Sequence, residues 1–309
     1  MSRFRLNISK LKKLNNNGKT LPSIEMFNYC TYKCGGRIRL LLEINTIENF
    51  IKVIQYLLQH NIPYFVLGNG SNILVSDSGF NGVVLKLGGD FARIQQLTDN
   101  TIECGVGVRL SQIYSYCLGS NLSGIEEGAG IPATIGGAVY MNASAYNYET
   151  AQIVKFVVAF VDGKITYFDN KSCMFSYRKS IFQDNNAIIL RVGLEFVKAD
   201  SEIIKEKFQS AMQKRQQSQP LDKPSAGSVF QRQNGIAIGK LLDEAGLKGL
   251  TIGQAQVSQK HANFIVNLGA ATAQDIYSLI RLVKVKIKDK YGIDLKEEIR
   301  YLGEFEWDS

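Results

Sequence analysis

Near the start of the chain, the spacing of apolar positions changes from that of a strand to that of a helix and then returns to that of strands. Residues 37–44 read Arg-Ile-Arg-Leu-Leu-Leu-Glu-Ile and predict a strand. Thr46 is a suitable N-cap for a helix whose apolar positions over residues 47–58 share one face, and Asn61-Ile-Pro63 ends it. Three further strands are expected from short apolar runs, at residues 64–67, 73–75 and 83–87. The order of elements is therefore βαβ-like.

The middle of the chain has the alternation of a mostly antiparallel sheet. Strands are expected at residues 101–110, 153–161, 165–168 and 187–197, with a helix at residues 111–118. The pair Asp162-Gly163 is typical of a tight hairpin turn, so the second and third of these strands are expected to pair.

The last third of the chain contains two long helical patterns. A charged helix is expected to begin at Asp200 or Ser201, and a second pattern runs from a capping-box-like start at Thr272 to Gly292. A domain boundary is therefore expected near residues 198–200.

Composition places the chain among globular proteins, since 45% of its 309 residues are apolar and 21% are charged. The formal net charge of +8 lies at one end, because residues 1–40 contain nine Lys and Arg residues and one Glu. The remainder is neutral overall, which argues against a body that binds nucleic acid, although a basic arm can contact anions. We expect residues 1–20, which are basic and rich in Asn, to pack loosely.

Five scattered cysteines without a CxxC pair favour a reducing compartment, and a cytoplasmic protein is expected. The two histidines, His60 and His261, are too few for an all-histidine metal centre, and no metal is expected. We expect His261 to be a hydrogen-bonded structural residue rather than a base. No apolar run approaches the roughly 18 residues of a membrane span, so no membrane association is expected.

Two glycine-rich segments are candidates for binding a ligand. The first, Gly68-Asn69-Gly70-Ser71-Asn72, joins two apolar runs, and consecutive amides in such a loop form a nest for a diphosphate. The alternative is an ordinary surface turn between strands. The loop has neither a GxGxxG fingerprint nor a P-loop lysine, so Rossmann and Walker sites are disfavoured.

The second segment spans Gly130 to Ala138 and combines a Pro turn with a Gly-Gly step. Two such segments about 60 residues apart would clamp one elongated dinucleotide, or they are two structural turns.

A serine after a small-residue turn, Ser228, lacks the G-x-S-x-G elbow of a hydrolase. Arg178 would hold a carboxylate or be a solvated charge, and Glu298 by itself is typical of a salt-bridged strand end.

In this order, the segments resemble the UDP-N-acetylenolpyruvoylglucosamine reductase family over about residues 30–304. The matching stretches are residues 68–72, 79–84, 130–143, 177–180, 219–220, 224–230, 245–249, 257–267 and 298–300. Each motif alone is weak, but six or more in register are specific.

The resemblance implies an α+β fold: a vanillyl-alcohol-oxidase-type FAD-binding domain of two α/β subdomains, followed by a C-terminal α+β substrate domain. It divides the chain into a basic N-terminal arm (1–28), an FAD-binding domain (29–198, with subdomains of about 29–88 and 89–198) and a substrate-binding domain (199–309). The short path from Arg178 to Ala187 is similar to the shorter type of the family, which lacks an inserted tyrosine loop.

The resemblance also implies the chemistry. NADPH gives a hydride to non-covalently bound FAD, and the hydride then passes to the enolpyruvyl group of a UDP-linked amino sugar, which yields UDP-N-acetylmuramate for peptidoglycan synthesis. The family pattern maps the proton donor to Ser228, and maps stabilisation of the intermediate to Arg178 and Glu298. We expect a monomeric enzyme.

The same mapping gives the binding residues. The FAD contacts are Gly68, Asn69, Gly70, Ser71, Asn72, Gly130, Ile131, Pro132, Gly136, Gly137 and Asn142. Arg232 and Lys260 are weaker candidates for the substrate diphosphate, with a solvent-facing pair of cations as the alternative.

Several positions depart from the family pattern. Cys34 replaces a Thr, Gln233 replaces a Pro, and Ala133 and Ser144 stand where glycine is common. An alanine at a site that needs positive φ would be strained, so Ala133 is the departure with the largest expected effect. Two alternatives stay open: another FAD oxidoreductase with a different substrate, and a non-catalytic protein that binds anions through the basic arm.

Overall fold

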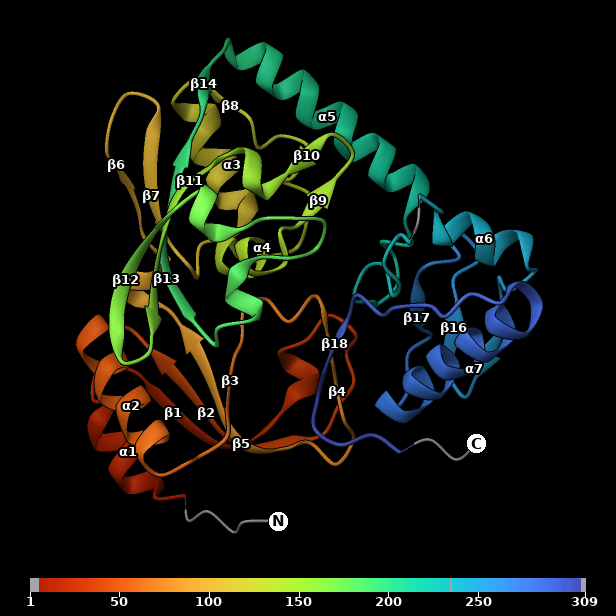
Figure 1. Ribbon diagram of the computed structural model, residues 1–309, viewed down its shortest axis with the longest axis horizontal. Coiled ribbons are helices and arrows are strands. Elements are labelled where there is room, and N and C mark those ends of the chain that lie inside the picture. Colours follow the sequence, from red (N-terminus) through yellow and green to blue (C-terminus); the bar gives the residue numbers. More distant parts are fainter. Residues whose placement is uncertain (1–5, 234, 307–309) are drawn as a thin grey trace. The chain divides into compact units, whose positions relative to one another are not determined.

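The computed structural model describes residues 6–233 and 235–306, and the chain divides into two compact units. The first unit comprises Met1–Pro22, Leu40–Asn69 and Gly82–Arg215, and the second comprises Ser23–Arg39, Gly70–Asn81 and Gln216–Ser309. The helices of the two units are α1 (Ile8–Leu14), α2 (Ile47–Gln59), α3 (Leu110–Gly119), α4 (Ile135–Met141), α5 (Ser201–Ser218), α6 (Ile238–Glu244) and α7 (Ala273–Tyr291), labelled in Figure 1.

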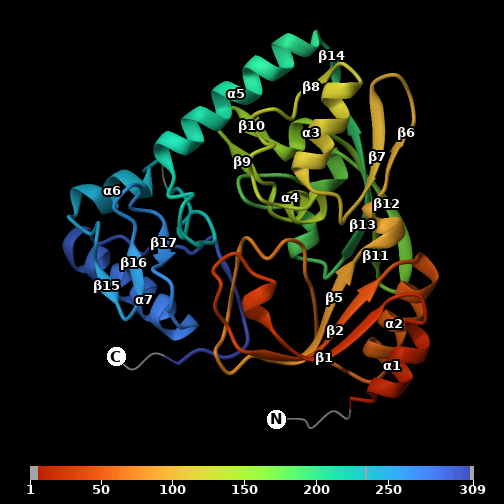
Figure 2. The same ribbon diagram turned by 180° about the vertical axis from the view of Figure 1, so that it is seen from behind.

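A four-stranded sheet opens the fold, and the predicted βαβ order is found in it. Its strands are β1 (Lys19–Glu25), β2 (Arg37–Ile44), β5 (Phe80–Leu87) and β3 (Tyr64–Val66), in the order β1-β2-β5-β3. The last two strands pair in parallel, as their connection requires. Thr46 caps α2 as predicted, and Phe50 and Ile54 of that helix are fully buried. Figures 1 and 2 both show α1 and α2 together beside this sheet.

A five-stranded antiparallel sheet forms the rest of the first unit's core. Its strands are β12 (Lys164–Asp169), β11 (Val154–Val161), β13 (Ile188–Glu195), β7 (Thr101–Gly105) and β6 (Ile94–Gln96), in that spatial order. The predicted hairpin is confirmed, because Val161 pairs with Lys164 around the turn and Asp162 and Gly163 both have positive φ. Helix α4 contacts β13 and β7 of this sheet. It thereby places the second glycine-rich segment at the edge of a rigid core.

Short strands and one charged helix complete this unit. The strands are β8 (Leu122–Ser123), β9 (Ser144–Ala145), β10 (Tyr148–Glu149) and β14 (Val197–Lys198), which pair as β10-β9 and β14-β8. Helix α5 begins where it was predicted, and the Asp200 carboxylate accepts from the N–H of Glu202. The ring of Phe208 on α5 stacks on Tyr114 of α3, with centroids 4.1 Å apart. This contact attaches the exposed helix to the core.

The second unit is built on a small antiparallel sheet and one amphipathic helix. Its strands are β15 (Thr251–Ile252), β16 (Ala255–Val257) and β17 (Ile265–Asn267). A separate two-stranded sheet of the same unit pairs β18 (Arg300–Leu302) in parallel with β4 (Ile73–Val75). Figure 2 shows α7 against the β15–β17 sheet, and the predicted apolar stripe of α7 is buried. Its capping box at Thr272 and its left-handed end at Gly292 are both confirmed.

Two sequence expectations are wrong in detail. Residues 8–20 are not loosely packed, because α1 buries Leu11 and the buried Asn15 amide donates to carbonyls of Lys19 and Glu43. The apolar run from residue 101 is not one strand, since β7 ends at Gly105 and Leu110 begins α3. Alternation alone did not reveal the turn between them. Residues 1–5 of the predicted arm lie outside the described residues.

In the described part of the chain, no helix combines the length and the apolar character needed to cross a membrane.

Candidate active site

The first glycine-rich loop leaves its amides unused. None of the main-chain N–H groups of residues 68–72 donates to an acceptor in the part of the chain that the structure describes. The loop is instead held by its carbonyls. The Gly70 carbonyl accepts from the N–H of Thr31 at 3.0 Å, and the Asn72 carbonyl accepts from the N–H of Arg300 at 2.9 Å. Consecutive amides without acceptors are what an anion-binding nest requires.

Gly70 is a position that only glycine fits. Its φ is +65°, and an added Cβ would lie 2.1 Å from the Tyr29 carbonyl oxygen. The turn therefore needs glycine both for its left-handed backbone and for the close approach of the Tyr29 segment.

The second glycine-rich segment contacts the first within the first unit. The Asn69 side-chain amide donates to the Pro132 carbonyl at 2.7 Å, and a Cβ on Gly68 would lie 2.8 Å from the Thr134 hydroxyl oxygen. Most amides of this second segment are used inside the protein, for example those of Ile135 and Gly136, which donate to carbonyls of Val108 and Val106. The second segment is thus the more rigid of the two.

Ala133 carries no left-handed strain. It is absent from the non-glycine residues with positive φ in the described chain, and its carbonyl accepts from the N–H of Leu110. The strain considered from sequence therefore does not arise at this position. Asn142 is different, because it ends α4 in the left-handed region and its side chain is almost completely buried. That amide contacts Glu149, donates to the Ser176 carbonyl at 2.9 Å and accepts from the N–H of Ala151 at 3.0 Å.

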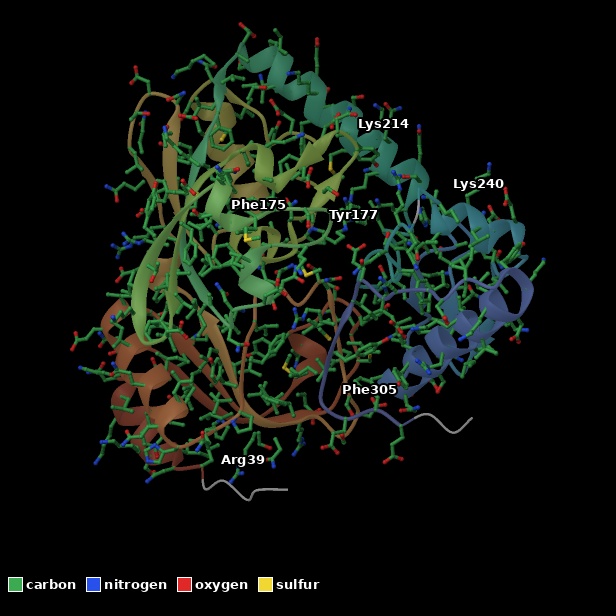
Figure 3. All side chains as sticks on the ribbon, viewed as in Figure 1. Arg39, Phe175, Tyr177, Lys214, Lys240 and Phe305 are labelled. Carbon is green, nitrogen blue, oxygen red and sulfur yellow. The ribbon has the colours of Figure 1, made fainter. Side chains whose placement is uncertain are left out.

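Arg178 lies in a tight turn of the first unit. Its φ is +58°, and Ser176 and Lys179 exchange two main-chain hydrogen bonds of 3.0 Å across it. The guanidinium donates to the Ser144 hydroxyl at 2.7 Å. Figure 3 labels the neighbouring Tyr177, whose ring centroid is 5.4 Å from the Arg178 guanidinium carbon. Residues 181–187 hold one short 3₁₀ turn before β13, which leaves no room for a long inserted loop.

Ser228 and Glu298 are brought together in the second unit. The N–H of Glu298 donates to the carbonyl of Val229, the residue after Ser228, at 2.7 Å. The Asn72 side chain donates to the Glu298 carbonyl at 3.2 Å, so the same backbone segment also holds the first glycine-rich loop. One hydrogen-bonded network of this unit therefore joins residues 70–72 to two of the three predicted catalytic residues.

Asn263 holds the Ser228 segment in place. Its buried side chain accepts from the N–H of Phe230 at 3.0 Å and donates to the carbonyl of Phe230 at 2.8 Å, and its own carbonyl accepts from Val229. Sequence reasoning noted the stretch around Asn263 without assigning this role. A polar residue between apolar strand positions was the available signal.

The two weaker substrate candidates, Arg232 and Lys260, are exposed residues of the second unit. The Lys260 ammonium donates to the Gln216 carbonyl.

Arg215 was not predicted from sequence, where it belongs to a charged helix. Its side chain lies against Gly130, since a Cβ added there would be 3.1 Å from the Arg215 Cδ. Burial lowers the pKa of this guanidinium, and no carboxylate pairs with it in the described chain. A half-buried cation beside a glycine-rich segment is a candidate contact for an anionic ligand.

His261 is a structural residue, as expected. Its Nδ1 accepts from the N–H of Asn263 at 3.2 Å, and its ring packs edge-on against Phe264. Burial of the ring lowers the pKa of His261 below its ordinary value, and the nearby Lys248 ammonium acts in the same direction.

Two family models match the chain. One, described as the FAD binding domain, matches residues 38–168. The other, described as the C-terminal domain of UDP-N-acetylenolpyruvoylglucosamine reductase, matches residues 219–302.

Curated relatives match almost the whole chain. The UDP-N-acetylenolpyruvoylglucosamine reductase of Caldanaerobacter subterraneus subsp. tengcongensis is 41% identical over 298 residues, which are 96% of this chain and 98% of the relative. That of Syntrophomonas wolfei is 40% identical over 280 residues, covering 90% and 93%. The crystal structure of the Thermus caldophilus reductase matches with a TM-score of 0.79 at 34% identity, over 93% of this chain and 99% of that one.

The donor set fits FAD. A dinucleotide carries a diphosphate, and the five free amides of residues 68–72 supply neutral donors in the close-packed form that a diphosphate needs. The glycines at 68 and 70 keep the backbone close to its neighbours, which a Cβ would prevent.

We expect Gly70→Ala to weaken both flavin retention and stability. The left-handed backbone alone costs about 1–2 kcal/mol for an L-residue, and the contact with the Tyr29 carbonyl adds to it. The flavin-to-protein absorbance ratio after desalting and the melting temperature measure the two effects. Gly119→Ala is the matched control, because no heavy atom lies within 4 Å of a Cβ at this exposed end of α3. A Gly70→Ala protein with full flavin and an unchanged melting temperature would contradict this account.

We expect stability to fall as the pH drops below about 6.5, the ordinary pKa of histidine. The folded-state pKa of His261 is lowered, so the unfolded state binds the proton more readily and gains on acidification. Melting temperatures across this range should therefore fall more steeply for the natural protein than for His261→Asn, whose amide retains an acceptor. His60→Asn, which replaces an exposed histidine, is the control. It shows how much of the pH dependence of the melting temperature does not come from His261. Equal slopes with and without His261 would refute the assignment.

Proposed function

The chain belongs to the UDP-N-acetylenolpyruvoylglucosamine reductase family, and on that premise we propose which of its residues carry the reaction. It is an NADPH-dependent FAD oxidoreductase that reduces the enolpyruvyl group of UDP-N-acetylenolpyruvoylglucosamine to give UDP-N-acetylmuramate, a peptidoglycan precursor. Bound FAD supplies the hydride transfer, from NADPH to the enolpyruvyl methylene carbon. The alternative of a different substrate is excluded by this family membership.

We propose that residues 68–72 and 130–137 hold the FAD. The free amides of the first loop face the diphosphate, and the second segment fixes that loop through the bond between Asn69 and Pro132. Arg215 adds positive charge beside Gly130. Asn142 contributes by ordering the turn after α4, because its own amide is engaged within the protein.

Ser228 donates the proton in this proposal. Hydride addition to the methylene carbon leaves negative charge on the α-carbon, which spreads into the adjacent carboxylate as an enolate. A neutral hydroxyl is a sufficient acid for so strong a base. Asn263 bonds both main-chain groups of Phe230, its N–H and its carbonyl, and these two bonds hold the segment that carries the serine two residues earlier.

Arg178 and Glu298 stabilise the developing charge. A guanidinium supplies charge-assisted donors to the enolate oxygens. A bare carboxylate would repel an enolate, so Glu298 acts in its protonated form or through a hydrogen-bonded partner. Its main-chain bond to Val229 supports a role beside Ser228. We assign the substrate diphosphate to Arg232 and Lys260, two exposed cations of the second unit.

We further propose that residues 29–198 form the FAD-binding domain and residues 199–309 the substrate-binding domain, while residues 1–28, expected to be a basic arm, contribute α1 and β1 to the fold. The five cysteines are all free and buried, which supports a cytoplasmic location. One chain carries all the proposed catalytic residues, which supports a monomer. The absence of net charge outside residues 1–40 supports a function without nucleic acid.

We expect the purified protein to be yellow and to lose its visible flavin absorbance when NADPH is added without oxygen. Addition of the enolpyruvyl sugar nucleotide should then restore the absorbance, because the substrate accepts the hydride. UDP-N-acetylglucosamine, which lacks the enolpyruvyl group, is the control and should not restore it. A protein that bleaches but is not reoxidised by the substrate would disprove the function.

We expect Ser228→Ala to leave flavin reduction by NADPH unchanged and to slow reoxidation by substrate about 10²–10⁴-fold, the usual contribution of a positioned general acid. Stopped-flow absorbance of the two half-reactions separates these steps. Ser225→Ala, in the same short turn, is the matched control and should reoxidise normally. Reoxidation of Ser228→Ala at the natural rate would remove this serine from the mechanism.

A further inference from the structure

The backbone of Arg178 is held in place by hydrogen bonds that do not involve its side chain. Two main-chain hydrogen bonds between Ser176 and Lys179 close the turn around its left-handed φ. The Gln183 side-chain amide then donates both to the Arg178 carbonyl at 3.0 Å and to the Tyr140 carbonyl at 2.8 Å. These bonds attach the turn to the last residues of α4.

The guanidinium of Arg178 is fixed at a second point. Its Nη1 donates to the Ser144 hydroxyl oxygen at 2.7 Å and to the Ser144 carbonyl oxygen at 3.3 Å. The shorter contact is within the range of a strong charge-assisted hydrogen bond, whereas the longer one is near its limit. The hydroxyl is therefore the main acceptor.

Ser144 is itself rigidly placed. It pairs with Glu149 in the β9–β10 hairpin. Asn142, two residues earlier, donates to the Ser176 carbonyl at 2.9 Å, which ties this hairpin directly to the Arg178 turn. Both ends of the Arg178–Ser144 bond thus belong to one framework, and the bond adds orientation at a small entropic cost.

We propose that Ser144 is a positioning residue for Arg178, an inference that rests on the proposed role of Arg178 in stabilising the enolate. The hydroxyl holds Nη1 and thereby sets the plane of the guanidinium, which directs its remaining N–H groups. A hydroxyl accepts this hydrogen bond and leaves the positive charge of the guanidinium in place, whereas a carboxylate would neutralise it. Alanine or glycine at this position would lack the 2.7 Å hydrogen bond that Nη1 donates to the hydroxyl.

The test compares Ser144→Ala with Ser144→Thr in the flavin-loaded protein. Loss of one hydrogen bond to a charged group should slow reoxidation by the enolpyruvyl substrate about tenfold in Ser144→Ala. Flavin content, melting temperature and flavin reduction by NADPH should stay unchanged, which distinguishes positioning from a merely structural role. Ser144→Thr keeps the hydroxyl and should restore the rate. Ser115→Ala, an exposed serine of α3, controls for the substitution itself.

Arg178→Lys separates this inference from the function on which it rests. If reoxidation is slowed in Arg178→Lys and in Ser144→Ala, and the double variant is no slower than Arg178→Lys alone, the two residues act as one unit. If only Arg178→Lys is slow, Ser144 has no positioning role and the inference is wrong. If Arg178→Lys reoxidises normally, the proposed role of Arg178 fails and the inference fails with it. Equal slowing of both half-reactions in Ser144→Ala would assign the serine to structure alone.

Discussion

Five consecutive N–H groups must stay without an acceptor if residues 68–72 are to bind a diphosphate. A loop whose amides have no acceptor is easily disordered, so it has to be fixed by other groups. Here the carbonyls of Gly70 and Asn72 accept from Thr31 and Arg300, and the side chains of Asn69 and Asn72 donate to carbonyls elsewhere. The loop is therefore ordered entirely through its carbonyls and side chains, and its amides remain available.

The same constraint joins the proposed cofactor loop to two of the proposed catalytic residues in the second unit. The segment that holds Asn72 includes Glu298, whose N–H donates to the residue after Ser228. A shift of the glycine-rich loop would consequently move the backbone segments that carry these two side chains. Backbone bonds of this kind hold reacting groups more firmly than side-chain contacts do, because fewer rotatable bonds intervene.

Local patterns predicted much of the fold, and long-range contacts account for what was missed. Period and capping located α2, α7 and the β11–β12 hairpin. The vanillyl-alcohol-oxidase-type fold class, which the family resemblance implied, is confirmed. The two glycine-rich segments were visible as motifs, but the Asn69–Pro132 bond joins residues 63 positions apart and has no local signal. The same is true of Arg215 beside Gly130 and of the Asn15 amide, which orders a segment that composition suggested was loose.

Neutral side chains fix the segments of the proposed site in both units. Asn263 fixes the Ser228 segment, Asn69 joins the two glycine-rich segments, and the Ser144 hydroxyl orients Arg178. A charged group in any of these places would have to be desolvated and would alter the field at the site where ligand charge develops. An amide or hydroxyl gives direction through a hydrogen bond and leaves the net charge of the site unchanged. In the role proposed for it, the guanidinium of Arg178 responds to the charge that appears during the reaction from an orientation that the Ser144 hydroxyl sets.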